Sequence, residues 1–242
     1  MSKLIVIGDI HGRATWKFII EKEKDADIIV FVGDYFDSYD IKTETQVNNF
    51  LDIIEFKKTS DKEVILLIGN HDHHYFPEIG ESGTGGYQQV GKYQISPILD
   101  QNKRYLQIAY NHGNFLFTHA GVSEIFMNDC LGKDGWEMTA EAIAEDVNEL
   151  WKHKPLAFTF NGFEQYGDNQ QQTPIWIRPR SLMKGGQSLK KKGIIQVVGH
   201  TQQDQIDIKG KATGGKYFFI DTLGTSKQYL IIQDTIVSCS KI

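Results

Sequence analysis

The sequence has few cysteines, no long apolar run and no excess of basic residues, and each of these absences excludes a class of protein. Two cysteines, Cys130 and Cys239, are too few for a disulfide framework, so we expect reduced thiols in a cytoplasmic protein. The apolar run near the N-terminus is too short for a signal peptide, and no run approaches the roughly 20 residues that span a bilayer. A formal net charge of −5 gives no support for general binding to nucleic acids or to membranes.

Short apolar runs alternate with amphipathic stretches in the first third of the chain. The runs at 4–8, 27–33 and 63–69 are typical of buried strands, and the stretches at 13–24 and 43–58 have the spacing of helices. Strands separated by helices in this way are typical of βαβ units, in which the strands are parallel. With 40% hydrophobic residues, the chain can bury a sizeable core.

The rest of the chain has a different pattern. The runs at 105–110 and 114–119 flank the turn residues NHGN, which predicts a β-hairpin, and residues 139–154 have helical spacing. No repeat or linker divides the sequence, so we expect one domain over residues 1–242. Five more strands, expected to be antiparallel because short turns separate them, are predicted at 194–199, 205–209, 216–221, 229–233 and 235–239.

Each of the three early strands ends in glycine followed by polar residues: GDIHG at 8–12, GDYFD at 33–37 and GNHD at 69–72. Glycine and aspartate are ordinary turn residues, but the carboxyl ends of parallel strands meet along one edge of a sheet, where ligands bind. Carboxylates gathered without a cation would repel one another, whereas carboxylate, imidazole and amide ligands together suit ions such as Mn, Fe or Zn. The motifs therefore predict a metal site, with these converging side chains: Asp9, His11, Asp34, Asp37, Asn70, His71 and Asp72.

Two later histidines also follow apolar strands, His119 in FTHAG and His200 in VVGHT. A single histidine at a strand end is usually a surface or hydrogen-bonding residue, but after three motifs of the same design we expect both to be metal ligands. By contrast, we expect His73 and His74, which continue the third motif, to be ordinary polar side chains of a loop. The glycine-rich residues 80–91 lack the GxxxxGKS/T spacing of a nucleotide-binding loop, and we expect a mobile loop there.

The order GDxH, GDxxD, GNHD/E, a strand-end histidine and GH resembles that of the calcineurin-like metallophosphoesterases. The match extends from Asp9 to His200, and the THAG and VVGHT forms look closest to the phosphoprotein-phosphatase branch with its bacterial and phage relatives. The resemblance implies an α/β fold, a four-layer α/β/β/α sandwich with two packed mixed sheets. Many other branches have a second metal-binding histidine where this chain has Gln202, which favours a first metal completed by water.

The resemblance also implies two divalent metal ions, with Mn²⁺ expected and Fe, Zn, Ni or Mg as alternatives. Such a centre turns a bridging water into hydroxide and directs it at phosphorus. Asn70 is expected to contact the phosphate as well as a metal. The implied ligands are Asp9 and His11 on the first metal, Asp34 as the bridge, and Asn70, His119 and His200 on the second.

The same resemblance makes His71 the general acid and Asp37 the carboxylate that orients its ring. A phosphate also needs a cation to bind its remaining oxygens, and Arg178 in PIWIRPR matches one family arginine, with Arg180 as the second candidate. From the residue types alone, an exposed basic pair is an equally good interpretation. The other family arginine is missing, because Ser38 follows GDYFD.

Three functions remain open at this stage. The first is a metal-dependent phosphatase acting on phosphomonoesters, with phosphoserine or phosphothreonine in proteins among its substrates. The second is a phosphodiesterase or pyrophosphohydrolase acting on nucleotides, dinucleoside polyphosphates or RNA ends, which the missing arginine at Ser38 keeps open. The third is a catalytically silent scaffold, which the complete set of motifs disfavours. The expected partner is a phosphorylated protein, nucleotide or small molecule.

Overall fold

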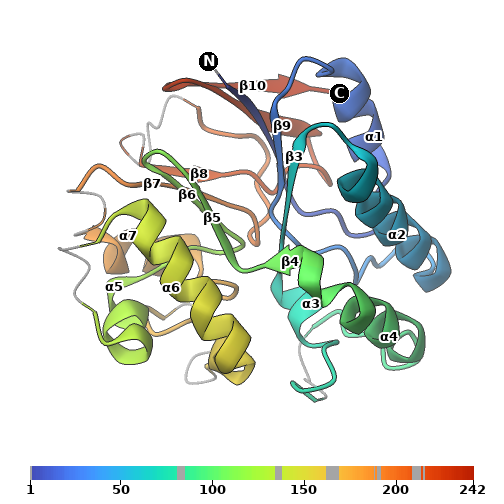
Figure 1. Ribbon diagram of the computed structural model, residues 1–242, viewed down its shortest axis with the longest axis horizontal. Coiled ribbons are helices and arrows are strands. Elements are labelled where there is room, and N and C mark those ends of the chain that lie inside the picture. Colours follow the sequence, from blue (N-terminus) through green and yellow to red (C-terminus); the bar gives the residue numbers. More distant parts are fainter. Residues whose placement is uncertain are drawn as a thin grey trace.

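The computed structural model of the chain describes residues 2–80, 85–133, 138–161, 169–187, 189, 192–208, 214 and 216–242, and these form two mixed β-sheets flanked by helices (Figure 1). In the first sheet the strand order is β10–β9–β1–β2–β3–β4, with β1 to β4 parallel and β9 and β10 antiparallel. Its strands are β1 (Lys3–Ile7), β2 (Ile28–Phe31), β3 (Glu63–Leu67), β4 (Leu106–Gln107), β9 (Gln228–Gln233) and β10 (Ile236–Lys241).

The second sheet has the order β5–β6–β7–β8. Strands β5 and β6 are antiparallel and form the predicted hairpin, with His112 opposite Phe115 at the turn. Strand β7 is parallel to both β6 and β8. The strands of this sheet are β5 (Ala109–His112), β6 (Phe115–Thr118), β7 (Ile195–Val198) and β8 (Tyr217–Phe219).

Helices cover the outer face of each sheet, with α1 and α2 beside the first sheet and α6 beside the second (Figure 1). The predicted helices at 13–24, 43–58 and 139–154 are confirmed within two residues at each end. The Thr139 side chain accepts a hydrogen bond from the N–H of Ala142 and so caps the start of α6. The helical segments are α1 (Thr15–Lys22), α2 (Thr43–Thr59), α3 (Asn70–His73), α4 (Lys92–Asn102), η1 (Lys103–Tyr105), α5 (Glu124–Phe126), η2 (Met127–Leu131), α6 (Ala140–His153), η4 (Pro155–Phe158) and α7 (Pro179–Gly185).

Alternation along the strands divides the core into an inner and an outer part. Leu4 and Val6 of β1 pack in a cluster with Phe117 of β6, between the two sheets. Ile5 and Ile7 of the same strand belong to the cluster that includes the helices. Because successive side chains of a strand point to opposite faces, this separation confirms the predicted α/β/β/α sandwich with two packed mixed sheets.

Three details of the predicted strands are wrong. The run at 105–110 is not one strand, because the chain passes from β4 to β5 at Ile108, where the Asn148 side chain accepts the N–H groups of Ile108 and Ala109. Strands β7 and β8 are parallel rather than antiparallel. A parallel pair needs a return connection, and residues 205–208, where a strand was predicted, are part of that connection; residue 209 lies outside the described residues.

Within the described part of the chain, no helix is long and apolar enough to cross a membrane. The predicted glycine-rich loop is described only in part, because residues 81–84 lie outside the described residues. The part from Gly85 to Gly91 packs beside α2, where Gln88 accepts a hydrogen bond from the Thr43 hydroxyl at 2.6 Å.

Candidate metal centre

The loops that follow β1, β2, β3, β6 and β7 meet at one place, so the two sheets contribute to the same site. His119, after β6, has Nε2 2.9 Å from Oδ1 of Asn70, which follows β3. The main-chain N–H of His200, after β7, donates to the Asp9 carboxylate at 3.0 Å. We call the six predicted metal ligands gathered here the strand-end cluster: Asp9, His11, Asp34, Asn70, His119 and His200.

Glycines in the motifs allow this close approach. A Cβ atom on Gly69 would lie 2.0 Å from Oδ1 of Asp34, and one on Gly199 would lie 1.9 Å from Oδ1 of Asp9. Both distances are far shorter than any van der Waals contact between these atoms. The glycine before Asn70 and the glycine before His200 are therefore required by the carboxylates that face them.

The backbone of the site is strained in a consistent way. Six non-glycine residues in the described part of the chain have positive φ, and four of them are predicted site residues: His11 (41°), Asp34 (52°), Asp37 (63°) and His200 (65°). Positive φ is unfavourable for residues with a Cβ and persists where the surrounding structure holds it. The strain is concentrated where the strand-end motifs turn their side chains toward one another.

The three histidines of the strand-end cluster are each oriented by a main-chain carbonyl. A carbonyl oxygen only accepts hydrogen bonds, so the ring nitrogen facing it must carry hydrogen. The second nitrogen of a neutral ring then presents a lone pair. The three contacts are His11 Nδ1 to Phe36 O (2.6 Å), His119 Nδ1 to Val32 O (2.8 Å) and His200 Nε2 to Trp176 O (3.0 Å).

The second nitrogen of each ring faces an oxygen atom. Nε2 of His11 and of His119 lie 3.8 and 3.3 Å from Oδ2 of Asp34. Nδ1 of His200 lies 2.8 Å from Oδ1 of Asn70. Burial lowers the pKa of His11 and, more strongly, that of His200, so both rings are held neutral. Neutral nitrogens and ligand oxygens that face one another fit a cation between them, and the carbonyl contacts are of the kind that orient metal-binding histidines.

The carboxylates of the cluster also fit a cation. Ligand atoms of Asp9, His11 and Asp34 all lie within 4.8 Å of one another. Burial, together with the charges of Asp221 and Asp34, raises the pKa of Asp9 well above its usual range. Asp34 is buried too, but its pKa is held well below the usual range by His119 and His71. A divalent ion would relieve the repulsion among these acids.

Asp221, which sequence reasoning missed, is a further buried acid of this site. Burial and the charge of Asp34 raise its pKa to about 6. It follows β8 directly after the apolar run YFFI, so the strand-end pattern that identified Asp9 could have identified it as well. Asp72, by contrast, was expected to converge on the site but accepts the main-chain N–H groups of Gly69, Asp34 and Tyr35 at 2.7–2.9 Å. Its carboxylate therefore holds two of the loops together.

A second group of side chains, which we call the Asp37 cluster, consists of Asp37, His71, His74 and Tyr75. Nδ1 of His71 lies 2.9 Å from Oδ2 of Asp37, as the predicted pairing of these residues requires. Burial lowers the pKa of His71, but the charge of Asp34 and the hydrogen bond with Asp37 outweigh it and raise the pKa to about 9. The expectation that His73 and His74 are ordinary loop side chains is wrong, since both are only 2% exposed.

The family model of the calcineurin-like phosphoesterases matches residues 2–204 of this chain. The chain belongs to this family. Membership implies a metal-dependent hydrolase and agrees with the donor set of the strand-end cluster. No curated protein sequence matches the chain.

Solved structures share the fold of this calcineurin-like phosphoesterase at low sequence identity. A cold-active protein-tyrosine phosphatase of a psychrophilic Shewanella species is 16% identical with a TM-score of 0.65, over 99% of this chain and 77% of the other. A protein serine/threonine phosphatase from Saccharomyces cerevisiae is 14% identical with a TM-score of 0.58, over 100% and 80%. A metallophosphoesterase from Sphaerobacter thermophilus is 12% identical with a TM-score of 0.53, over 99% and 88%. At these identities the likeness concerns the fold alone.

The cations near the centre of this calcineurin-like phosphoesterase differ in their placement. Arg178 is half-buried beside the strand-end cluster, and its Nη1 donates to Thr201 Oγ1 at 3.1 Å and to the His200 carbonyl at 3.3 Å. Arg180 is exposed in the first turn of α7. Ser38 donates its hydroxyl to Asp40 at 2.7 Å, so no cation comes from that position.

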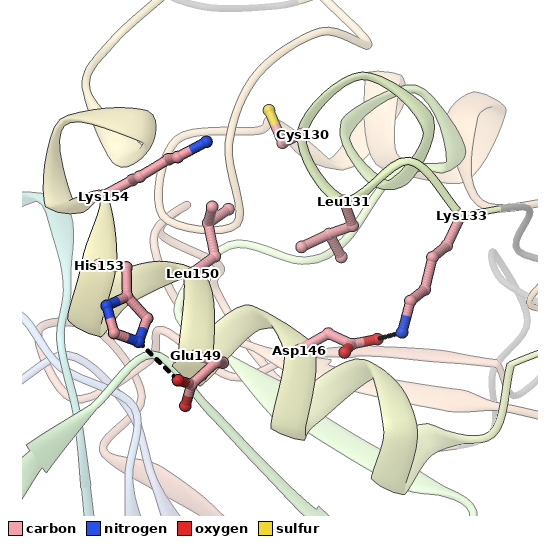
Figure 2. Close-up of a pocket in the computed structure, with 8 residues that line it drawn as sticks. All are labelled: Cys130, Leu131, Lys133, Asp146, Glu149, Leu150, His153 and Lys154. Carbon is pink, nitrogen blue, oxygen red and sulfur yellow. Dashed lines mark hydrogen bonds and ion pairs between the residues drawn. The ribbon is translucent and has the colours of Figure 1, made fainter.

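A groove of about 260 Å³ elsewhere in this phosphoesterase, between η2 and α6, shares no residue with either cluster (Figure 2). Asp146 pairs with Lys133 across the groove, and Glu149 pairs with His153 along α6. Because these acids are already paired, the groove has no gathered set of ligands comparable to the strand-end cluster.

Proposed function

We propose that this calcineurin-like phosphoesterase is a binuclear metal-dependent phosphatase that hydrolyses phosphomonoesters, with phosphoserine and phosphothreonine in proteins among its substrates. The arrangement of the three strand-end histidines carries the proposal. Each ring has one nitrogen held by a main-chain carbonyl and the other directed at an oxygen of Asp34 or Asn70. Such pre-oriented ring nitrogens around a buried carboxylate suit two cations that share Asp34.

The strand-end cluster would hold the two ions, with Mn²⁺ as the proposed metal. Divalent ions bound there supply Lewis acidity toward phosphoryl oxygens and lower the pKa of water. Asp34 would contribute to both ions, because its Oδ2 faces the ring nitrogens of both His11 and His119. Asp9 and Asn70 would complete the two sides of the centre.

His71 is the proposed general acid. The carboxylate of Asp37 accepts the hydrogen of Nδ1, which leaves Nε2 to carry the proton for the leaving group. The main-chain N–H of His71 donates to Oδ1 of Asp34 at 2.9 Å, so the acid is tied directly to the strand-end cluster. As the oxygen of water bonds to phosphorus and the P–O bond to the leaving group breaks, the proton passes from Nε2 to the leaving oxygen, and the products are an alcohol and inorganic phosphate.

Arg178 is the proposed phosphate-binding cation. Its contacts with Thr201 and the His200 carbonyl hold the guanidinium beside the cluster, and a guanidinium can bind two phosphate oxygens at once. Arg180 is exposed, and we assign it at most an outer contact with substrate.

A diester substrate is the second candidate, and the uncharged serine at position 38 favours it. The family position that commonly carries an arginine has no cation here, and a monoester dianion needs more positive charge around it than a diester does. Nucleotides, dinucleoside polyphosphates and RNA ends are the corresponding substrates.

The deciding experiment compares p-nitrophenyl phosphate with its bis-ester, using purified protein loaded with Mn²⁺ and a chelated sample as control. Faster turnover of the monoester, abolished by the chelator, is the expected result. Faster turnover of the bis-ester would replace the proposal with the diesterase. Absence of turnover on both esters, with metal bound, would indicate a scaffold.

A further inference from the structure

The carboxylate of Asp37 is in contact with three side chains at once. Nδ1 of His71 and Nε2 of His74 lie 2.9 and 2.8 Å from the same oxygen, Oδ2. The Tyr75 hydroxyl donates to the other oxygen, Oδ1, at 2.5 Å. Asp37, His74 and Tyr75 are each no more than 2% exposed, so these contacts are formed away from water.

The chemistry of the carboxylate determines which atoms carry hydrogen. An ionised carboxylate only accepts hydrogen bonds, so His71 directs its Nδ1–H at Oδ2, and Nε2 of His74 lies in ion-pair contact with the same oxygen. Burial and the charge of Asp37 raise the pKa of Tyr75, which keeps its phenol protonated and able to donate.

Asp37 also needs outside support for its conformation. Its φ of 63° is unfavourable for a residue with a Cβ, so its side chain is not held in place by a relaxed backbone. His74 contacts Oδ2 of Asp37, the oxygen that also contacts His71, and Tyr75 contacts the other oxygen, Oδ1. Together they limit rotation of the carboxylate that would tilt the ring of His71.

The described end of the glycine-rich segment covers these contacts. The main-chain N–H of Gln88 donates to the Tyr75 hydroxyl at 2.7 Å. The ring of Tyr87 stacks on Tyr75 with centroids 5.0 Å apart, and it meets His74 edge-on at 4.9 Å. A Cβ on Gly86 would lie 3.1 Å from Cε1 of His71, so only a glycine allows this approach without displacing the ring.

We propose that His74 and Tyr75 are positioning residues of the phosphoesterase reaction, which act by fixing the Asp37 carboxylate and through it the ring of the general acid His71. The inference rests on the proposed function. It assigns a role to the segment HDHHY beyond the His71–Asp37 pair and explains why a buried histidine and a buried tyrosine meet one carboxylate.

The test uses the Mn²⁺-loaded protein with two substrates, phosphoserine and p-nitrophenyl phosphate. The leaving group of phosphoserine is a strongly basic alkoxide that needs a proton, whereas the leaving group of p-nitrophenyl phosphate, p-nitrophenolate, is a stable anion. Tyr75→Phe and His74→Leu should each lower kcat on phosphoserine by roughly 10-fold, the usual effect of losing an outer orienting partner. On p-nitrophenyl phosphate the loss should be less than about 3-fold, and KM should change little on both substrates, because proton donation rather than binding is impaired.

Two further variants separate positioning from packing. His74→Gln places an amide N–H near the position of Nε2 and should restore most of the phosphoserine activity lost in His74→Leu. The matched control is His73→Gln, since His73 is the neighbouring buried histidine but donates to the carbonyl of Pro155 instead. It should leave the ratio of the two activities unchanged.

Equal losses on the two substrates, no loss on either, or failure of His74→Gln to restore activity would overturn the positioning role. Metal content and thermal unfolding of every variant show whether a loss reflects folding, and Tyr75→Phe and His74→Gln are conservative enough to fold. The proposed function fails separately, if the wild type hydrolyses neither ester. If the wild type is active and His71→Ala loses phosphoserine activity selectively while the His74 and Tyr75 variants do not, only this inference fails.

Discussion

The strand-end cluster and the Asp37 cluster are built from the same kinds of side chain but differ in where the hydrogens lie. Each contains a group of three acids and histidines whose ligand atoms lie within 4.8 Å of one another: Asp9, His11 and Asp34 in one, Asp37, His71 and His74 in the other. In the strand-end cluster, main-chain carbonyls take the N–H of every histidine, and the remaining nitrogens face oxygens. In the Asp37 cluster, the N–H of His71 faces the carboxylate itself.

The difference shows that short distances between acids and histidines do not by themselves identify a metal site. A carboxylate that already accepts hydrogen bonds from an imidazole and a phenol, as Asp37 does from His71 and Tyr75, is satisfied, and a cation there would have to displace hydrogens. Asp34 instead faces the ring nitrogens of His11 and His119 whose partner nitrogens are held by main-chain carbonyls, so a cation can lie between them. We therefore propose that the strand-end cluster binds metal and that the Asp37 cluster orients a proton donor.

The largest effect should come from Asp34→Asn. Oδ2 of Asp34 faces two of the cluster's histidines, so its loss should weaken both ions, and activity should fall by on the order of 10⁴-fold or more as water activation is lost. Metal analysis after gel filtration measures the binding directly. Retention of both ions at full affinity would contradict the role of Asp34 as a ligand of both ions.

His71→Ala should have the next largest effect and should leave metal content unchanged. Turnover of phosphoserine should fall by roughly 10²–10⁴-fold, the usual contribution of a positioned proton donor, while p-nitrophenyl phosphate loses far less. Parallel kinetics on the two substrates measure the difference. Loss of an ion in this variant would identify His71 as a metal ligand and contradict its role as the general acid.

Gly199→Ala should disturb the strand-end cluster alone. The added Cβ would lie 1.9 Å from Oδ1 of Asp9, and overpacking of this kind lowers the free energy of unfolding by about 1–3 kcal/mol. Mn²⁺ affinity should fall as well, because the carboxylate must move. Gly85→Ala is the control, since nothing lies within 4 Å of its Cβ position and its effect should stay within about 0.5 kcal/mol. Similar losses of stability and of Mn²⁺ affinity in the two variants would show that the close approach of Asp9 to Gly199 does not require a glycine.

The smallest effect concerns His73, which belongs to neither cluster. Burial lowers its pKa to about 4, against about 6.5 in an unfolded chain. Between these values the unfolded chain binds a proton that the folded protein excludes, so stability falls as the pH decreases below 6.5. His73→Gln removes this titration and should reduce the loss of unfolding free energy between pH 7 and pH 5 by roughly 1–2 kcal/mol. Identical pH profiles of wild type and variant would show that His73 is not held neutral.

Much of the fold and of the strand-end cluster could be predicted because their signals are local. Each early strand is a short apolar run, and glycine with aspartate or asparagine marks its end. The parallel pairing of β7 with β8 could not be predicted, since it depends on a long return connection rather than on the pattern of either strand.

The Asp37 cluster was only half predicted, and the reason is the turn of α3. His73 and His74 are adjacent in sequence, yet His73 donates to Pro155 and packs on Trp151, while His74 faces Asp37. Consecutive helical residues point in different directions, and no apolar periodicity in NHDHHY indicates which histidine faces which neighbour. The family resemblance implied the pair of Asp37 and His71, but only the structure shows what holds Asp37.

Anomalous diffraction from crystals grown with Mn²⁺ tests the division between the two clusters most directly. We expect two peaks that share Asp34, one on the side of Asp9 and His11 and the other on the side of Asn70, His119 and His200. We expect no peak among Asp37, His71 and His74. A peak in the Asp37 cluster, or a strand-end cluster without Mn²⁺ at saturating concentration, would contradict this division.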